Sequence, residues 1–106
     1  MSIIGIHISD SYQKQAYDFG SRIGLIITSK IIKPKIRECG SNYPKWYMKY
    51  NFKTNIMDEI NKLYPEKCSG YDHIWENEDQ FMNEFYQSFK NGFTSSMNIY
   101  LDKNMR

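Results

Sequence analysis

The stretch NEDQFMNEFYQSFKNGFTSSMNIYL, residues 77–101, is the longest segment of the chain with one consistent helical period. Its apolar side chains recur at steps of three and four, which lines one flank of a helix with aromatic rings and thioethers. We expect Asn77 to cap this helix, Gln80 to reach back toward it, and the rest of the chain to pack on the flank. The flank consists of Phe81, Met82, Phe85, Tyr86, Phe89, Phe93, Met97, Tyr100 and Leu101.

An earlier segment has the same helical period. Ser9 or Asp10 is a suitable cap for this helix, and Pro34 is expected to end it because proline cannot continue the hydrogen-bond ladder. An irregular basic loop is then expected over residues 33–44. The β-branched residues in 22–32 leave a buried strand open as an alternative for that part. The periodic residues are Tyr12, Ala16, Phe19, Ile23, Ile27 and Ile31.

Both predicted helices carry a row of small residues. Gly20 and Gly24 each cost about 1 kcal/mol relative to alanine inside a helix, so a packing gain should offset them. The rows, with one small residue in every four positions, are Ala16, Gly20 and Gly24 in the first helix and Ser88, Gly92 and Ser96 in the last. Backbones can approach closely where side chains are small. We therefore predict that the two helices cross at these rows and pack antiparallel.

Two further segments alternate between apolar and polar residues. Residues 3–8 and 45–53 both have the period of a strand, so they could pair as a short two-stranded sheet. A helix that begins at Pro44 is the alternative for the second segment, because proline is favoured in the first helical turn. A shorter helix is expected over residues 55–64. The predicted fold is mainly α, a small helical bundle in a single domain over residues 1–106, with this sheet as an optional addition.

Composition places the chain among ordinary globular domains. A chain of 106 residues can bury roughly 65% of its unfolded surface, so it needs neither a disulfide nor a metal to fold. No secretory leader and no apolar run long enough to span a membrane is present. We therefore expect a cytoplasmic protein that does not enter a membrane. Aromatic residues reach 16%, more than one small core needs, which predicts that some rings lie at a partner site.

The residues that could carry chemistry are few and poorly spaced. Zinc could use Cys39, Cys68, His7 and His73, but none of them forms the close pair that fixes two ligands locally. Cys68 with His73 is the one nucleophile and base pair, and the adjacent Asp72 is badly placed to orient the imidazole. No phosphate loop, nucleophile elbow or metalloprotease motif occurs. We expect no enzymatic activity, no metal and no cofactor.

The charges separate along the sequence. Residues 30–53 contain seven Lys and Arg against one Glu, whereas residues 54–84 contain eight Asp and Glu against two Lys. Basic residues interleaved with rings are typical of surfaces that bind macromolecules. The candidate partner-binding residues of the basic aromatic segment are Lys33, Lys35, Arg37, Lys45, Trp46, Tyr47, Lys49 and Lys53. Those of the acidic segment are Glu76, Glu78, Asp79 and Glu84.

These observations predict a small non-catalytic binding protein. A regulator, adaptor or inhibitor that acts by protein–protein contact is the main expectation, because surplus Tyr, Trp and Met are the residues that interface cores use. Small size and residues of AT-rich codons suit a phage or mobile-element modulator of a host nucleic-acid-handling system. Direct nucleic-acid binding by residues 30–53 is the alternative. A homodimer that pairs through the aromatic flank also remains open.

Overall fold

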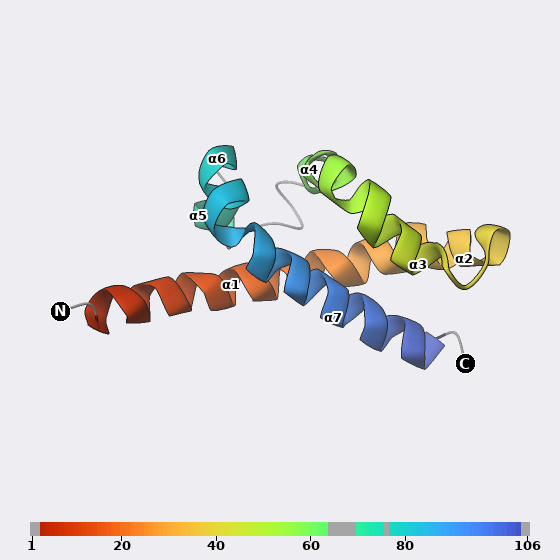
Figure 1. Cartoon of the computed structure of the whole chain (residues 1–106), viewed down its shortest axis with the longest axis horizontal. Coiled ribbons are helices and arrows are strands. Elements are labelled where there is room, and N and C mark those ends of the chain that lie inside the picture. The colour runs from red at the N-terminus through yellow and green to blue at the C-terminus, as the bar shows by residue number, and fades with distance from the viewer. Residues whose placement is uncertain (1–2, 64–69, 76, 105–106) are drawn as a thin grey trace.

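The computed structural model describes residues 3–63, 70–75 and 77–104, and all of its described regular structure is helical. The mainly α prediction is confirmed. The molecule is elongated, with principal extents of 52 × 25 × 23 Å. The described helices join end to end into three long rods, and α5 stands apart as a short helix; Figure 1 shows their arrangement. The elements are α1 (Ile3–Ile27), η1 (Thr28–Ile32), α2 (Lys33–Cys39), α3 (Tyr43–Trp46), η2 (Tyr47–Asn51), α4 (Phe52–Leu63), α5 (Asp72–Trp75), α6 (Glu78–Gln80), η3 (Phe81–Phe85) and α7 (Tyr86–Asn104), where η marks a π-helical turn.

The first rod joins α1, η1 and α2 without a break. It begins at Ile3, so the prediction of a cap at Ser9 or Asp10 is wrong, as is the prediction that Pro34 ends the helix. In η1 the Lys33 N–H bonds to the Thr28 carbonyl five residues back. This wider turn brings Pro34 into the first turn of α2, where a missing N–H is tolerated.

The basic loop predicted over residues 33–44 is therefore mostly helix. The first rod ends only at Gly40, whose φ of 97° lies in the left-handed region that favours glycine. The Gly40 N–H bonds to the Ile36 carbonyl at 2.8 Å and closes the last turn. Only residues 40–42 separate this rod from the next one.

The second rod joins α3, η2 and α4, and it overturns the predicted sheet. Residues 3–8 lie in α1, and residues 45–53 run through this rod, which has Pro44 in its first turn as the alternative proposed. The buried residues Tyr47, Phe52, Ile56 and Ile60 are five, four and four positions apart. The π turn absorbs the step of five, because the Phe52 N–H bonds to the Tyr47 carbonyl. The helix predicted over residues 55–64 is thus the end of a longer one.

The third rod joins α6, η3 and α7 and carries the predicted aromatic flank. Asn77 caps it, because its side-chain oxygen accepts the Gln80 N–H at 3.0 Å. Gln80 does not reach back to Asn77; its side-chain amide donates to Glu84 at 3.0 Å instead. The fully or nearly buried residues of the flank, one every four positions, are Phe81, Phe85, Phe89, Phe93 and Met97. The Phe89 and Phe93 rings pack at the centre of the core with Phe19 and Phe52. The ring centroids of Phe19 and Phe89 lie 5.2 Å apart, and those of Phe52 and Phe93 lie 4.8 Å apart.

The small-residue rows of α1 and α7 meet as predicted. A Cβ built on Gly20 would lie 2.0 Å from the Phe89 carbonyl oxygen, and one on Gly92 would lie 2.0 Å from that of Tyr17. The Ser21 hydroxyl also donates to the Gly92 carbonyl at 3.3 Å. At this crossing the two backbones are in direct contact.

The direction of the crossing differs from the prediction. Gly20 faces Phe89 and Gly24 faces Phe93, so residue numbers rise together along both helices. α1 and α7 therefore run parallel, not antiparallel, as their course in Figure 1 shows. Antiparallel packing is expected when a short loop joins two helices. Here the second rod and α5 lie between α1 and α7 in the sequence, so the chain has room to return to the starting end.

We predict that Gly20→Ala and Gly92→Ala each lower the free energy of unfolding by about 2 kcal/mol or more. The backbone clash outweighs the gain of about 1 kcal/mol in helix propensity. Urea denaturation followed by circular dichroism measures the change. Asp18→Ala, at an exposed position of the same helix, is the control and should leave stability unchanged or raised. Unchanged stability in both glycine variants would contradict the close crossing.

Candidate interaction surface

The outer face of the second rod carries a row of aromatic rings. The ring centroids of Tyr43 and Trp46 lie 5.7 Å apart, and those of Trp46 and Tyr50 lie 5.8 Å apart. Trp46 is 46% exposed and Tyr50 is 57% exposed. Large rings at this level of exposure contribute little to the core, so their apolar area is free to contact another molecule.

Lysines accompany these rings along the same rod. Lys45, Lys49 and Lys53 are all exposed and follow one another at steps of four, roughly 6 Å of helix rise. The Lys49 ammonium lies 5.3 Å from the centroid of the Tyr50 ring, within cation–π range. The sequence has no acidic residue between Glu38 and Asp58. We call Tyr43, Lys45, Trp46, Lys49, Tyr50 and Lys53 the basic aromatic surface.

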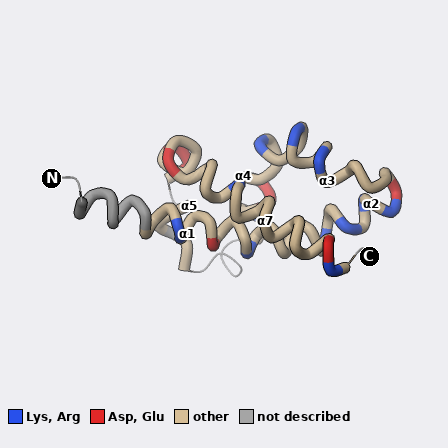
Figure 2. Tube along the Cα trace, turned by 60° about the horizontal axis from the view of Figure 1, so that its bottom comes forward, with Lys and Arg blue, Asp and Glu red and all other residues tan. Residues whose placement is uncertain are grey.

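The other predicted basic residues lie on α2. The Lys33 ammonium lies 5.8 Å from the centroid of the Tyr100 ring, and Lys35 pairs with Glu38 at 3.4 Å. Arg37 is exposed beside a shallow pocket between Ser29 and Glu38. α2 packs against α3, so the blue segments of the two helices gather toward the same end of the molecule (Figure 2). The structure thus brings both basic groups to one end, with Lys33 and Lys35 already engaged within the chain.

Tyr47 was predicted to be part of the partner-binding surface, and this is wrong. Its side chain is only 2% exposed, and its ring stacks on Phe93 with centroids 6.4 Å apart. Within the described chain the buried hydroxyl of Tyr47 has no hydrogen-bond partner. Burial, with smaller effects of Glu59 and Tyr43, raises the pKa of Tyr47 to about 12. Tyr47 is therefore a core residue that anchors the rod whose outer face carries Trp46.

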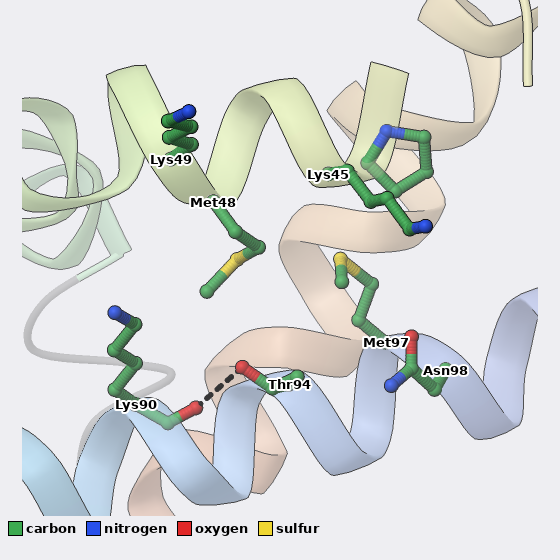
Figure 3. A pocket seen from close by; sticks show the side chains of 8 residues that line it. Lys45, Met48, Lys49, Lys90, Thr94, Met97 and Asn98 are labelled. Carbon is green, nitrogen blue, oxygen red and sulfur yellow. Dashed lines mark hydrogen bonds between the residues drawn. The ribbon is translucent and has the colours of Figure 1, made fainter. Parts of the chain in front are cut away.

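A pocket of about 470 Å³ lies beside the basic aromatic surface, between the second rod and α7. Figure 3 shows Met48 and Met97 pointing into the gap from opposite walls, and Lys90 extending into it from α7. The Thr94 hydroxyl donates to the Lys90 carbonyl at 2.8 Å, so it is occupied within its own helix. We call this the methionine pocket, and its lining residues are Pro44, Lys45, Met48, Lys49, Lys90, Thr94, Met97 and Asn98.

Sequence reasoning missed the α7 wall of the methionine pocket. Lys90, Thr94 and Asn98 follow one another at steps of four, so they predict a polar stripe on α7. That stripe gives no sign that α3 and η2 lie opposite it. The polar stripe could be recognised in the sequence, but only the fold shows that α3 and η2 lie opposite it.

The acidic residues lie at the start of the third rod. Glu78, Asp79 and Glu84 are exposed, whereas the predicted Glu76 lies outside the described residues. Glu78 and Asp79 occupy the first turn of α6, where negative charge complements the helix dipole. We call Glu78, Asp79 and Glu84 the acidic surface. It lies away from the basic aromatic surface along the molecule (Figure 2).

Among the described residues, those considered for zinc binding or nucleophilic catalysis do not lie together. Cys39 is exposed beside Asn42, Tyr43 and Trp46 in a pocket of about 300 Å³, and Cys68 lies outside the described residues. The His73 ring packs near Tyr12 and hydrogen-bonds the Gln15 side chain. Among described side chains, no cluster of three or more His, Cys, Asp or Glu could hold a metal ion. No described helix has both the length and the apolar character needed to cross a membrane.

Comparison with protein-family models, curated proteins and solved structures finds no match to this chain.

We predict that Tyr47→Phe raises the free energy of unfolding at neutral pH by about 1 kcal/mol, because it removes a buried hydroxyl without a partner. The wild type should also lose stability as pH rises from about 10 to about 12, since the unfolded tyrosine ionises first. The Tyr47→Phe variant should lose less of its free energy of unfolding over the same pH range. Urea denaturation at a series of pH values measures both effects.

The matched control is Tyr50→Phe, which removes the hydroxyl of an exposed ring and should change neither quantity. The contrary result is that the wild type and the Tyr47→Phe variant have the same free energy of unfolding at neutral pH and lose it equally at alkaline pH. That result would show that the Tyr47 hydroxyl is hydrated in solution.

Proposed function

We propose that this chain is a small non-catalytic binding protein that recognises a protein partner through the basic aromatic surface. The observation that carries the proposal is the exposed pair Trp46 and Tyr50, which stand beside Lys45 and Lys49 on one face of a rod anchored from behind by Tyr47. Tryptophan and tyrosine are the residues in which binding energy concentrates at protein interfaces. A rigid helix holds them in place before binding, which lowers the entropic cost of association.

The partner is expected to be acidic where it meets this surface. Among the described residues no carboxylate pairs with Lys45 or Lys49, so both cations are free to steer a negatively charged partner. The methionine pocket beside them adds thioethers, which adapt to irregular apolar side chains. We propose that a protein with such a surface acts as a regulator, adaptor or inhibitor. It could be encoded by a phage or mobile element.

Direct binding of nucleic acid is the second candidate. Single-stranded nucleic acids are bound by cations that contact phosphates beside rings that stack on bases. Lys49 lies against the Tyr50 ring, so a charge and a ring face are presented together. This arrangement could bind a phosphate and a base, or an acidic protein surface. The experiment must therefore distinguish a nucleic-acid ligand from a protein ligand.

We predict that Trp46→Ala combined with Tyr50→Ala abolishes capture of the partner by the immobilised chain from a nuclease-treated host lysate, with a loss of at least about 2 kcal/mol once the partner is purified. Leu25→Ala combined with Ile99→Ala is the control, because these side chains are 50% and 55% exposed but lie elsewhere. Capture that is equal for both double variants would place the partner site on another surface.

The second candidate is tested by mixing the same proteins with labelled single- and double-stranded oligonucleotides. Fluorescence anisotropy that rises on mixing, falls steeply with salt and is lost in the Trp46 and Tyr50 variant would make nucleic acid the ligand. No binding at low salt would exclude it and leave the protein partner.

A further inference from the structure

The two charged surfaces of this chain are complementary to each other. The basic aromatic surface lies in a stretch without any acidic residue, and residues 77–89 around the acidic surface contain no Lys or Arg. In the described chain, no cation pairs with Glu78 or Asp79 and no carboxylate pairs with Lys45 or Lys49. Among the described residues, these charges are therefore not paired with each other or with other ions.

The helices that carry the two surfaces also lie on the same side of the molecule. In both Figure 1 and Figure 2, α6 and the second rod rise on the same side of α1, displaced from each other along the long axis. A twofold axis perpendicular to the long axis would therefore set the acidic surface of each copy against the basic aromatic surface of the other. The same contact would then occur twice, and a twofold arrangement closes without leaving a free end.

Besides opposite charges, the two surfaces carry apolar side chains that could contact each other. Met82 follows Asp79 by three positions and Glu78 by four in a continuous helical rod, so it lies close to the carboxylates along the helix, with part of its side chain packed against the core. Met82 is only partly buried. The methionine pocket presents a related pattern, because Met48 and Met97 point into it and Lys45 and Lys90 are among the residues that line it (Figure 3).

We propose that a second copy of this chain is an occupant of the basic aromatic surface, so that the protein forms a twofold dimer in which acidic and basic aromatic surfaces pair. This inference rests on the proposed function, since it names a partner for the same surface. A stable interface buries about 800 Å² on each copy, and the chain has 6885 Å² of accessible surface. Two separate contacts on one side of an elongated molecule can supply that area.

The test is sedimentation velocity on the nuclease-treated full chain at about 50 mM and about 500 mM salt. The wild type should dimerise at low salt and dissociate as salt screens the charges. Lys45→Glu with Lys49→Glu should weaken the dimer at least about 100-fold, because like charges then face each other. Glu78→Lys with Asp79→Lys should do the same.

Mixing the two reversed variants is the decisive arm. In the mixed dimer one copy is acidic at both surfaces and the other is basic at both, so each of the two contacts regains opposite charges. The mixture should dimerise although neither variant does so alone. Lys30→Glu with Lys103→Glu carries the same change in net charge at exposed positions elsewhere and should dimerise like the wild type. Circular dichroism should show all variants folded, since the substituted side chains are exposed.

A wild type that stays monomeric at about 100 μM and low salt would overturn the dimer, and so would a mixture that fails to associate. A dimer that resists salt and both reversals would mean that copies pair through an apolar face instead. The proposed function would survive either failure, because its test is the Trp46-dependent capture of another protein.

Discussion

The contact between the backbones of α1 and α7 is the constraint on which the rest of the structure depends. Gly20, Gly24 and Gly92 remove the side chains that would hold the two helices apart, and a Cβ at any of them would meet backbone atoms of the other helix. Because the helices approach this closely, Phe19 and Phe89 can share one core. The second rod then covers that core from one side through Tyr47 and Phe52.

The π turn η2 keeps the second rod in step with this core. In an α-helix a residue five positions further on lies about 140° around the axis, so Phe52 would point away from the face that buries Tyr47. A turn that bonds five residues back absorbs the extra residue, and both Tyr47 and Phe52 stay buried. Trp46 and Tyr50 of the same segment lie outside this buried set, and both are exposed.

The charge layout adds a second level of organisation that the core does not need. Lys45 and Lys49 of the second rod have no ion pair with a carboxylate within the described chain, and Glu78 and Asp79 at the start of the third rod have none with a cation. Surface charges that are left unpaired contribute little to stability but strongly affect which molecules approach and in what orientation. The helices that carry both groups lie on the same side of α1 (Figure 1 and Figure 2), which is why recognition of an acidic partner and recognition of a second copy are related proposals.

The sequence by itself determined the features that depend on near neighbours: the helical flank from Phe81 to Met97, the Asn77 cap, the small-residue rows and the two charge blocks. Its local patterns misled where two periods competed, because the alternation of Trp46 and Tyr50 resembles a strand and a π turn has no distinctive residue pattern. Only the tertiary structure decided that α1 and α7 run parallel, that Tyr47 is buried, and that Lys90 faces Lys45 across a pocket. The physical reason is that a face becomes core or surface according to which distant segment covers it, and that choice is made by long-range packing.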